Sequence, residues 1–187
     1  MNQANTALQA TSRPGLHQSM VGRRLRGLAA LGLILSLVAC GFELRKTPEF
    51  AFNTVYTEVA PASVLGSELK RTLAAVGNIQ LITDAAQAKN AQVILDILQE
   101  QREKTVVGMN ASGQVREFQL RVRIKFRLRT PQGKELIPET ELLQQRDQSY
   151  DEAFALSKQA EEELLYRNMQ TDIVQQLMRR LAAIKEL

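Results

Sequence analysis

Tryptophan is absent from this sequence, and cysteine and histidine occur only once each, as Cys40 and His17. A disulfide needs two cysteines, so no disulfide within the chain supports its fold. Catalytic triads and zinc sites depend on histidine and cysteine side chains. Since both residues lie near the N-terminus, the composition argues against a nucleophilic enzyme and against a His/Cys metal protein.

The N-terminal segment has the three regions of a secretory signal peptide. The basic cluster Arg23, Arg24 and Arg26 precedes an apolar run from Leu28 to Val38. A transmembrane helix needs about 20 apolar residues, so this run is too short to span a bilayer comfortably. Residues 37–40 read Leu-Val-Ala-Cys, which resembles the lipobox of bacterial lipoproteins. Met20 begins a conventional signal of its own, and we expect translation to start there.

The lipobox resemblance implies that residues 1–39 are removed and that Cys40 becomes the first residue, acylated on its thiol and its new amine. Two or three acyl chains anchor a protein durably, at about 0.8 kcal/mol per buried methylene. Gly41 stands where an aspartate would favour the inner membrane, so we expect lipid anchoring at the periplasmic side of the outer membrane. The alternative is that Cys40 is an ordinary thiol in a signal that is uncleaved or cleaved elsewhere.

Removal of residues 1–39 changes the composition. That segment holds four of the 24 basic residues, none of the 20 acidic ones, and His17. The remaining chain is electrically neutral, which argues against nucleic acid as a partner. It also lacks histidine and a free thiol, so we expect no enzyme activity, no metal and no cofactor besides the covalent lipid on Cys40.

The patterns beyond Cys40 predict a tether over residues 40–51 and a single domain over 52–187. Strands are expected, in chain order, over residues 52–59, 79–83, 91–107, 118–129 and 134–150. Helices are expected over residues 64–76 and 158–184. The order is β-α-β-β-β-α when the brief segment 79–83 and the strand 91–107 are counted as one, and it predicts an α+β fold: a two-layer α/β sandwich in which two helices pack on one face of a roughly four-stranded sheet. Pro138 favours an edge position or a bulge for the last strand.

Residues 118–129 alternate without interruption between apolar and polar side chains. The apolar face is expected under the helices, so the cationic face looks outward. Its cations are Arg121, Arg123, Lys125, Arg127 and Arg129. One interpretation pairs them with acids of the neighbouring strands, chosen from Asp96, Glu100, Glu135, Glu139, Glu141 and Asp147. The other is a groove for an anionic partner such as a lipid phosphate.

Three motifs carry a family resemblance. Residues 40–45 read Cys-Gly-Phe-Glu-Leu-Arg, residues 112–118 contain Ser-Gly-Gln before Arg-Glu-Phe, and residues 155–158 read Ala-Leu-Ser-Lys before the long helix. With the order of elements, these motifs resemble the lipopolysaccharide-assembly lipoprotein family, LptE. The resemblance covers nearly the whole chain from Cys40 onward.

The resemblance implies a non-enzymatic outer-membrane lipoprotein that plugs the β-barrel protein LptD one-to-one, assists its assembly and contacts lipopolysaccharide. Lys158 matches a lysine associated with lipopolysaccharide contact. A second basic position is expected before Ser112, but Asn110 and Ala111 stand there. Together with cations of the groove interpretation above, the expected contact residues are Lys158, Arg116, Arg121, Arg123 and Lys125.

Two other functions remain open from the residues alone. The first is a lipoprotein that binds small lipids or peptidoglycan independently of any barrel. The second is an envelope hydrolase, which would need a carboxylate pair in a concave pocket. The run Glu161 to Glu163 does not provide that pair, because consecutive helical residues point about 100° apart.

Overall fold

The computed structural model describes residues 49–60 and 62–187. The expected signal peptide, the lipidation site Cys40 and most of the expected tether lie outside the described residues. The described elements are β1 (Thr54–Tyr56), α2 (Val64–Ala75), β2 (Gln80–Ile82), the 3-10 helix η1 (Ala85–Asn90), β3 (Val93–Met109), β4 (Val115–Arg129), β5 (Glu135–Ser149), the 3-10 helix η2 (Glu152–Phe154) and α3 (Ala155–Ala182).

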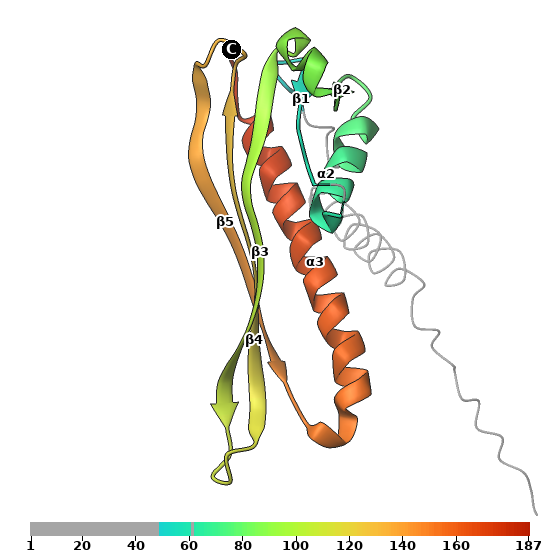
Figure 1. Ribbon diagram of the computed structural model, residues 1–187, viewed down its shortest axis with the longest axis vertical. Helices are drawn as coiled ribbons and strands as arrows, with labels where there is room; N and C mark the ends of the chain where they lie inside the picture. The colour runs from blue at the N-terminus through green and yellow to red at the C-terminus, as the bar shows by residue number, and fades with distance from the viewer. Residues whose placement is uncertain (1–48, 61) are drawn as a thin grey trace, which may run out of the picture. The chain divides into compact units, whose positions relative to one another are not determined.

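The strands form one sheet in the order β2-β1-β3-β4-β5 (Figure 1). β1 runs parallel to β2 and β3, whereas β3, β4 and β5 are antiparallel neighbours. Helices α2 and α3 lie on the same face of this sheet. The predicted α+β class is confirmed. The strand count is five rather than roughly four, because the two short segments β1 and β2 both pair into the sheet.

Helix α2 begins and ends as its sequence predicts. The Ser63 hydroxyl accepts a hydrogen bond from the Gly66 amide at 2.7 Å, which satisfies one of the free N–H groups of the first turn. Gly77 has a φ of 81°, a left-handed conformation that favours glycine just beyond a helix. Between these ends, Leu65 and Leu69 are fully buried against the sheet.

Strand β4 forms the centre of the core. From Leu120 onward its apolar residues are all fully buried, Phe118 is partly buried, and the cations between the apolar residues are only partly covered. The buried residues of β4 are Leu120, Val122, Ile124, Phe126 and Leu128. They share one cluster with the stripe of α3 that contains Met169, Ile173 and Leu177. The predicted alternation of this strand is therefore confirmed.

Strand β3 does not keep one alternation of inward and outward side chains along its whole length. Ile97 pairs with Phe126, and the next pair joins Gln99 to Lys125, so Leu98 has no partner of its own. One extra residue in one strand of an antiparallel pair is a β-bulge. From this point the side chains of β3 are shifted by one position relative to the two faces of the sheet.

The bulge corrects one expectation about charge pairing. Glu100 was expected beside Asp96 on the outward face, but it pairs in register with Ile124 and so lies on the helix side. Its carboxylate accepts a hydrogen bond of 2.6 Å from the Ser63 hydroxyl. Glu103 takes the outward position instead, opposite Arg121.

Strand β5 lies at the edge of the sheet and is irregular at its proline, as Pro138 predicts. The register shifts between the pairs Phe126–Thr140 and Leu128–Ile137. Proline has no N–H to donate to a neighbouring strand. An edge position next to a register shift is therefore where a strand tolerates it.

Candidate functional site

The five basic residues expected to contact lipopolysaccharide fall into two separate groups. Arg121, Arg123 and Lys125 project from β4 onto the outer face, defined as the face of the sheet opposite α2 and α3. Arg116 and Lys158 lie at the distal end, defined by the hairpin between β3 and β4 and the connection from β5 to α3 (Figure 1). The structure does not bring the five residues into one site.

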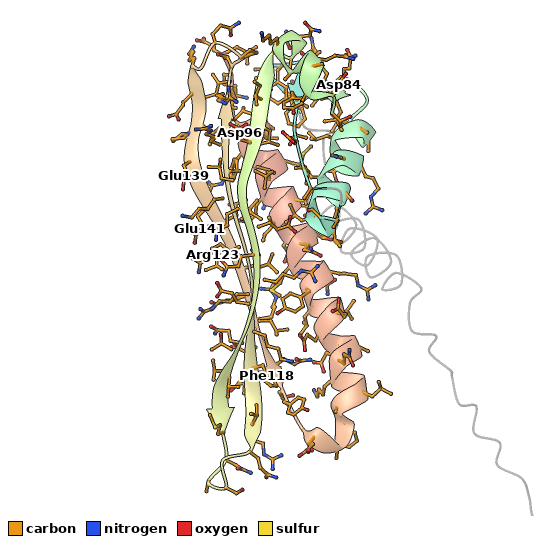
Figure 2. All side chains as sticks on the ribbon, in the orientation of Figure 1. Asp84, Asp96, Phe118, Arg123, Glu139 and Glu141 are labelled. Carbon is orange, nitrogen blue, oxygen red and sulfur yellow. The ribbon has the colours of Figure 1, made fainter. Side chains whose placement is uncertain are left out.

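On the outer face, each of these three cations has a carboxylate of a neighbouring strand within 4.0 Å. Arg123, Glu139 and Glu141 are labelled in Figure 2. The pairs are Arg121–Glu103 at 3.8 Å, Arg123–Glu103 at 4.0 Å, Arg123–Glu141 at 3.7 Å and Lys125–Glu139 at 3.5 Å. This arrangement supports the cross-paired interpretation of the cationic strand. It makes the outer face a surface of mixed charge rather than a purely cationic groove.

The cations nearest the C-terminal end of β4 are held more tightly. The Nε groups of Arg127 and Arg129 each donate a hydrogen bond of 2.8 Å to the same oxygen of Asp96. Partial burial alone would raise the pKa of the Asp96 carboxyl. The hydrogen bonds from Arg129 and Arg127 outweigh it and hold that pKa below its ordinary value. We call this group the Asp96 clamp.

At the distal end, Lys158 lies in the first turn of α3. Its ammonium donates hydrogen bonds to the Ser149 hydroxyl at 3.1 Å and to the Glu161 carboxylate at 2.8 Å. The side-chain amide of Gln148 donates to the Lys158 carbonyl at 2.8 Å, which ties the start of the helix to β5. The side-chain amide oxygen of Gln148, Oε1, is buried and has no partner among the described residues.

Arg116 and Lys158 lie on either side of Tyr150. One cavity of about 380 Å³ is lined by Arg116, Phe118 and Tyr150, and another of about 360 Å³ by Tyr150, Lys158 and Lys104. The rings of Phe118 and Tyr150 meet edge to face, with centroids 5.1 Å apart. Tyr150 of this aromatic pair therefore lines a cavity with each of the two basic residues, Arg116 and Lys158.

Lys104 also lies at the distal end, where no pattern of the sequence predicts it. Its ammonium lies 4.1 Å from the centre of the Phe118 ring and 2.6 Å from a carboxylate oxygen of Glu162. Lys104 reaches this side of the sheet only because the bulge at Leu98 shifts β3 by one residue. Neighbouring residues in the sequence give no sign of that shift.

Exposed apolar side chains gather at the same end. Leu156 is 83% exposed and Met109 64% exposed. The exposed apolar residues of the distal end are Val106, Val107, Met109, Phe154 and Leu156. Together with Arg116, Lys104 and Lys158 they make the distal end an amphipathic surface.

Within residues 49–60 and 62–187, no group of three or more His, Cys, Asp or Glu side chains is placed to hold a metal ion. The helices of the same residues include none with the length and apolar character needed to cross a membrane. The acids at the start of α3 serve as ion-pair partners, since Glu161 pairs with Lys158 and Glu162 with Lys104.

The fold is shared with solved bacterial lipoproteins. An uncharacterized lipoprotein B from Nitrosomonas europaea has a TM-score of 0.64 at 36% sequence identity, with 76% of this chain and 91% of that chain covered. Rare lipoprotein B from Shewanella oneidensis has a TM-score of 0.59 at 21% identity, with 70% of this chain and 95% of that chain covered. A minor lipoprotein from Acinetobacter baumannii has a TM-score of 0.57 at 22% identity, with 72% of this chain and 94% of that chain covered. The last two show the fold alone.

No curated protein matches the sequence. A family model, described as LptE, lipopolysaccharide-assembly, matches residues 52–181 and thus most of the described chain. Independently, more than a third of the aligned residues are identical between this chain and the relative from Nitrosomonas europaea, over most of both chains. The chain therefore belongs to the LptE family of lipopolysaccharide-assembly proteins.

Proposed function

We propose that this protein is an outer-membrane lipoprotein, anchored through acyl chains on Cys40, that plugs the LptD barrel and takes part in lipopolysaccharide transport to the cell surface. Membership of the LptE family supports a non-catalytic role in lipopolysaccharide assembly. Its structural relatives are lipoproteins. The anchor, the barrel partner and the direct lipid contact are the parts that go beyond this membership.

The observation that carries direct lipid contact is the amphipathic distal end. Lipopolysaccharide combines phosphate groups with acyl chains, so a protein that holds it needs basic groups and apolar surface side by side. Arg116, Lys104 and Lys158 supply the basic groups, and the exposed side chains of Phe154 and Leu156 supply apolar surface within the same connection. Ammonium and guanidinium groups are the usual protein ligands of phosphate.

The plug role is supported by the distribution of charge. The lumen of a wide β-barrel is polar, and a domain lodged in it needs polar surfaces without a large net charge. The chain from Cys40 onward is neutral, and its outer face alternates basic and acidic side chains. We expect a stable one-to-one complex with LptD that survives detergent extraction.

Co-purification tests the barrel partner. The tagged full-length protein is extracted in detergent from cells that also produce the LptD of the same organism, and the complex is identified by mass spectrometry. A one-to-one complex is expected. Recovery of the lipoprotein without any barrel protein would contradict the plug role and favour a lipoprotein that binds lipids or peptidoglycan independently.

Lipopolysaccharide titration tests the distal end. Lys158→Gln removes the charge and keeps a group able to bond Ser149, so we expect binding of fluorescent lipopolysaccharide to weaken roughly fivefold. Lys89→Gln is the matched control, because Lys89 is an exposed lysine of η1 with no ion pair among those the structure describes. Equal affinity of the Lys158 variant and the unchanged protein would refute lipid contact at this end.

A further inference from the structure

The middle of the outer face combines basic, amide and apolar side chains. Across the three long strands, Gln101 of β3, Arg123 of β4 and Leu143 of β5 lie in one row. Arg121 and Lys125 are the neighbours of Arg123 on the same face of β4. We call these five residues the central patch.

Arg123 is the less satisfied of the two arginines in this patch: the Nε of each is buried without an acceptor among the described residues, but Arg121 also donates a hydrogen bond to Gln119. A guanidinium has five N–H donors. Arg123 makes ion pairs with Glu103 at 4.0 Å and with Glu141 at 3.7 Å, both longer than a hydrogen bond. Its Nε group is buried without an acceptor among the described residues. In the Asp96 clamp, by contrast, both arginines donate at 2.8 Å.

Exposed leucines accompany this arginine. Leu143 lies directly across from Arg123 and is 41% exposed, and Leu98, at the bulge of β3, is 44% exposed. Charged and amide groups around a few apolar side chains are typical of a protein–protein contact, where the centre is apolar and the rim polar. Leu143 is thus only partly covered by the described residues.

We propose that the central patch docks a partner protein that presents a carboxylate to Arg123 and apolar side chains to Leu143. This inference rests on the proposed function, so the partner surface is the inner wall of the LptD barrel. A carboxylate fits the fork of N–H donors on a guanidinium in a bidentate manner, which gives orientation as well as attraction. The amide of Gln101 adds a polar contact in the same row.

The same face is poorly suited to lipid phosphates. Glu103, Glu139 and Glu141 lie within 4.0 Å of the three cations, so a multiply charged phosphate cluster meets as many carboxylates as cations. A single partner carboxylate adds only one negative charge and can displace the long contact to Glu103. This distinction separates the central patch from the distal end.

The test uses the co-purified complex of the full-length chain with LptD. Arg123→Glu places a negative charge opposite the partner carboxylate, and we expect the ratio of LptD to lipoprotein after detergent washing to fall roughly tenfold. Arg123→Lys keeps the charge without the bidentate fork, so an intermediate ratio is expected. Arg71→Glu, an exposed arginine of α2 on the helix layer, is the matched control and leaves the ratio unchanged.

Leu143→Ser tests the same contact without altering any charge, and circular dichroism of each variant shows whether the fold is kept. We expect the ratio to fall several-fold for this variant as well. A normal complex with folded Arg123→Glu and Leu143→Ser would overturn the docking surface and leave the plug role standing. Absence of the complex with the unchanged chain would overturn both the docking surface and the plug role. Loss of lipopolysaccharide binding by Arg123→Glu with a normal complex would assign the patch to phosphate and overturn the inference.

Discussion

The two ends of β3 differ in what surrounds them. Before the bulge, Val93 and Leu95 are fully buried in the main core, and Ile94 is buried on the opposite side against Tyr56 and Ile82. After the bulge, residues 99–105 are polar on both faces, and β3 is mostly exposed as far as its end at Met109. The first part is enclosed by apolar side chains on both sides, whereas the second is held by hydrogen bonds and ion pairs.

This difference suggests separate roles for the two regions: the first stabilises the fold, and the second makes contacts with other molecules. The proximal half, which contains β1, β2, η1, α2 and the first residues of β3, supplies buried apolar area, the main source of folding free energy. The distal half presents polar and exposed apolar side chains that a partner or lipid can reach. Replacing residues of the two halves should therefore affect different measurements.

The largest effect is expected from the core beside the bulge. Phe126 is fully buried and pairs with Ile97. Phe126→Ala leaves a cavity, and we expect the free energy of unfolding in urea to fall by about 3–5 kcal/mol. Met109→Ala, at the exposed end of the same sheet, is expected to change it by less than about 0.5 kcal/mol. Similar losses for the two variants would remove the contrast between the halves.

Much of this contrast could be predicted from the sequence where local patterns repeat. The alternation of β4, the cap at Ser63 and the edge position marked by Pro138 are local properties, and the structure confirms them. The bulge at Leu98 was not predicted, because residues 99–105 are polar on both faces and give no periodic pattern. For the same reason Lys104 was missed and Glu100 was assigned to the wrong face.

The division of the basic residues into two groups also lay beyond the sequence. Arg116 and Arg121 are five positions apart on one strand, but an odd spacing places them on opposite faces, and only Arg116 meets Tyr150. The approach of Lys158 to the same tyrosine depends on where α3 begins against β5. That position is set by packing between distant segments.

A second, smaller effect is expected from the Asp96 clamp. Asp96→Asn removes the charge that two arginines share, and we expect the free energy of unfolding to fall by about 1–2 kcal/mol. Glu141→Gln is the matched control, because Glu141 is more exposed and only 3.7 Å from Arg123, without a hydrogen bond. Its expected effect is below about 1 kcal/mol.

The clamp should also show a characteristic pH dependence. The pKa of Asp96 is below its ordinary value of 3.8 in the folded chain, so the unfolded chain binds a proton more readily. The contribution of the clamp is therefore complete above about pH 5 and is lost as the pH falls through the folded pKa. The difference between the unchanged protein and Asp96→Asn is expected to shrink below pH 3.8 in urea titrations. A difference that stays constant down to pH 2 would contradict this assignment.

The smallest effect belongs to the ion pair between Lys104 and Glu162, which joins the distal part of β3 to α3. The atoms are 2.6 Å apart, but the side chains are 36% and 19% exposed, so water and salt screen the attraction. A double-mutant cycle with Lys104→Ala and Glu162→Ala is expected to give a coupling of about 0.2–1 kcal/mol, lower in 1 M salt. Yet Lys104→Ala alone should weaken lipopolysaccharide binding, because Lys104 lines the cavity beside Lys158. A strong coupling with unchanged lipid affinity would make Lys104 a structural residue, and the distal half would then contribute to stability rather than to contact.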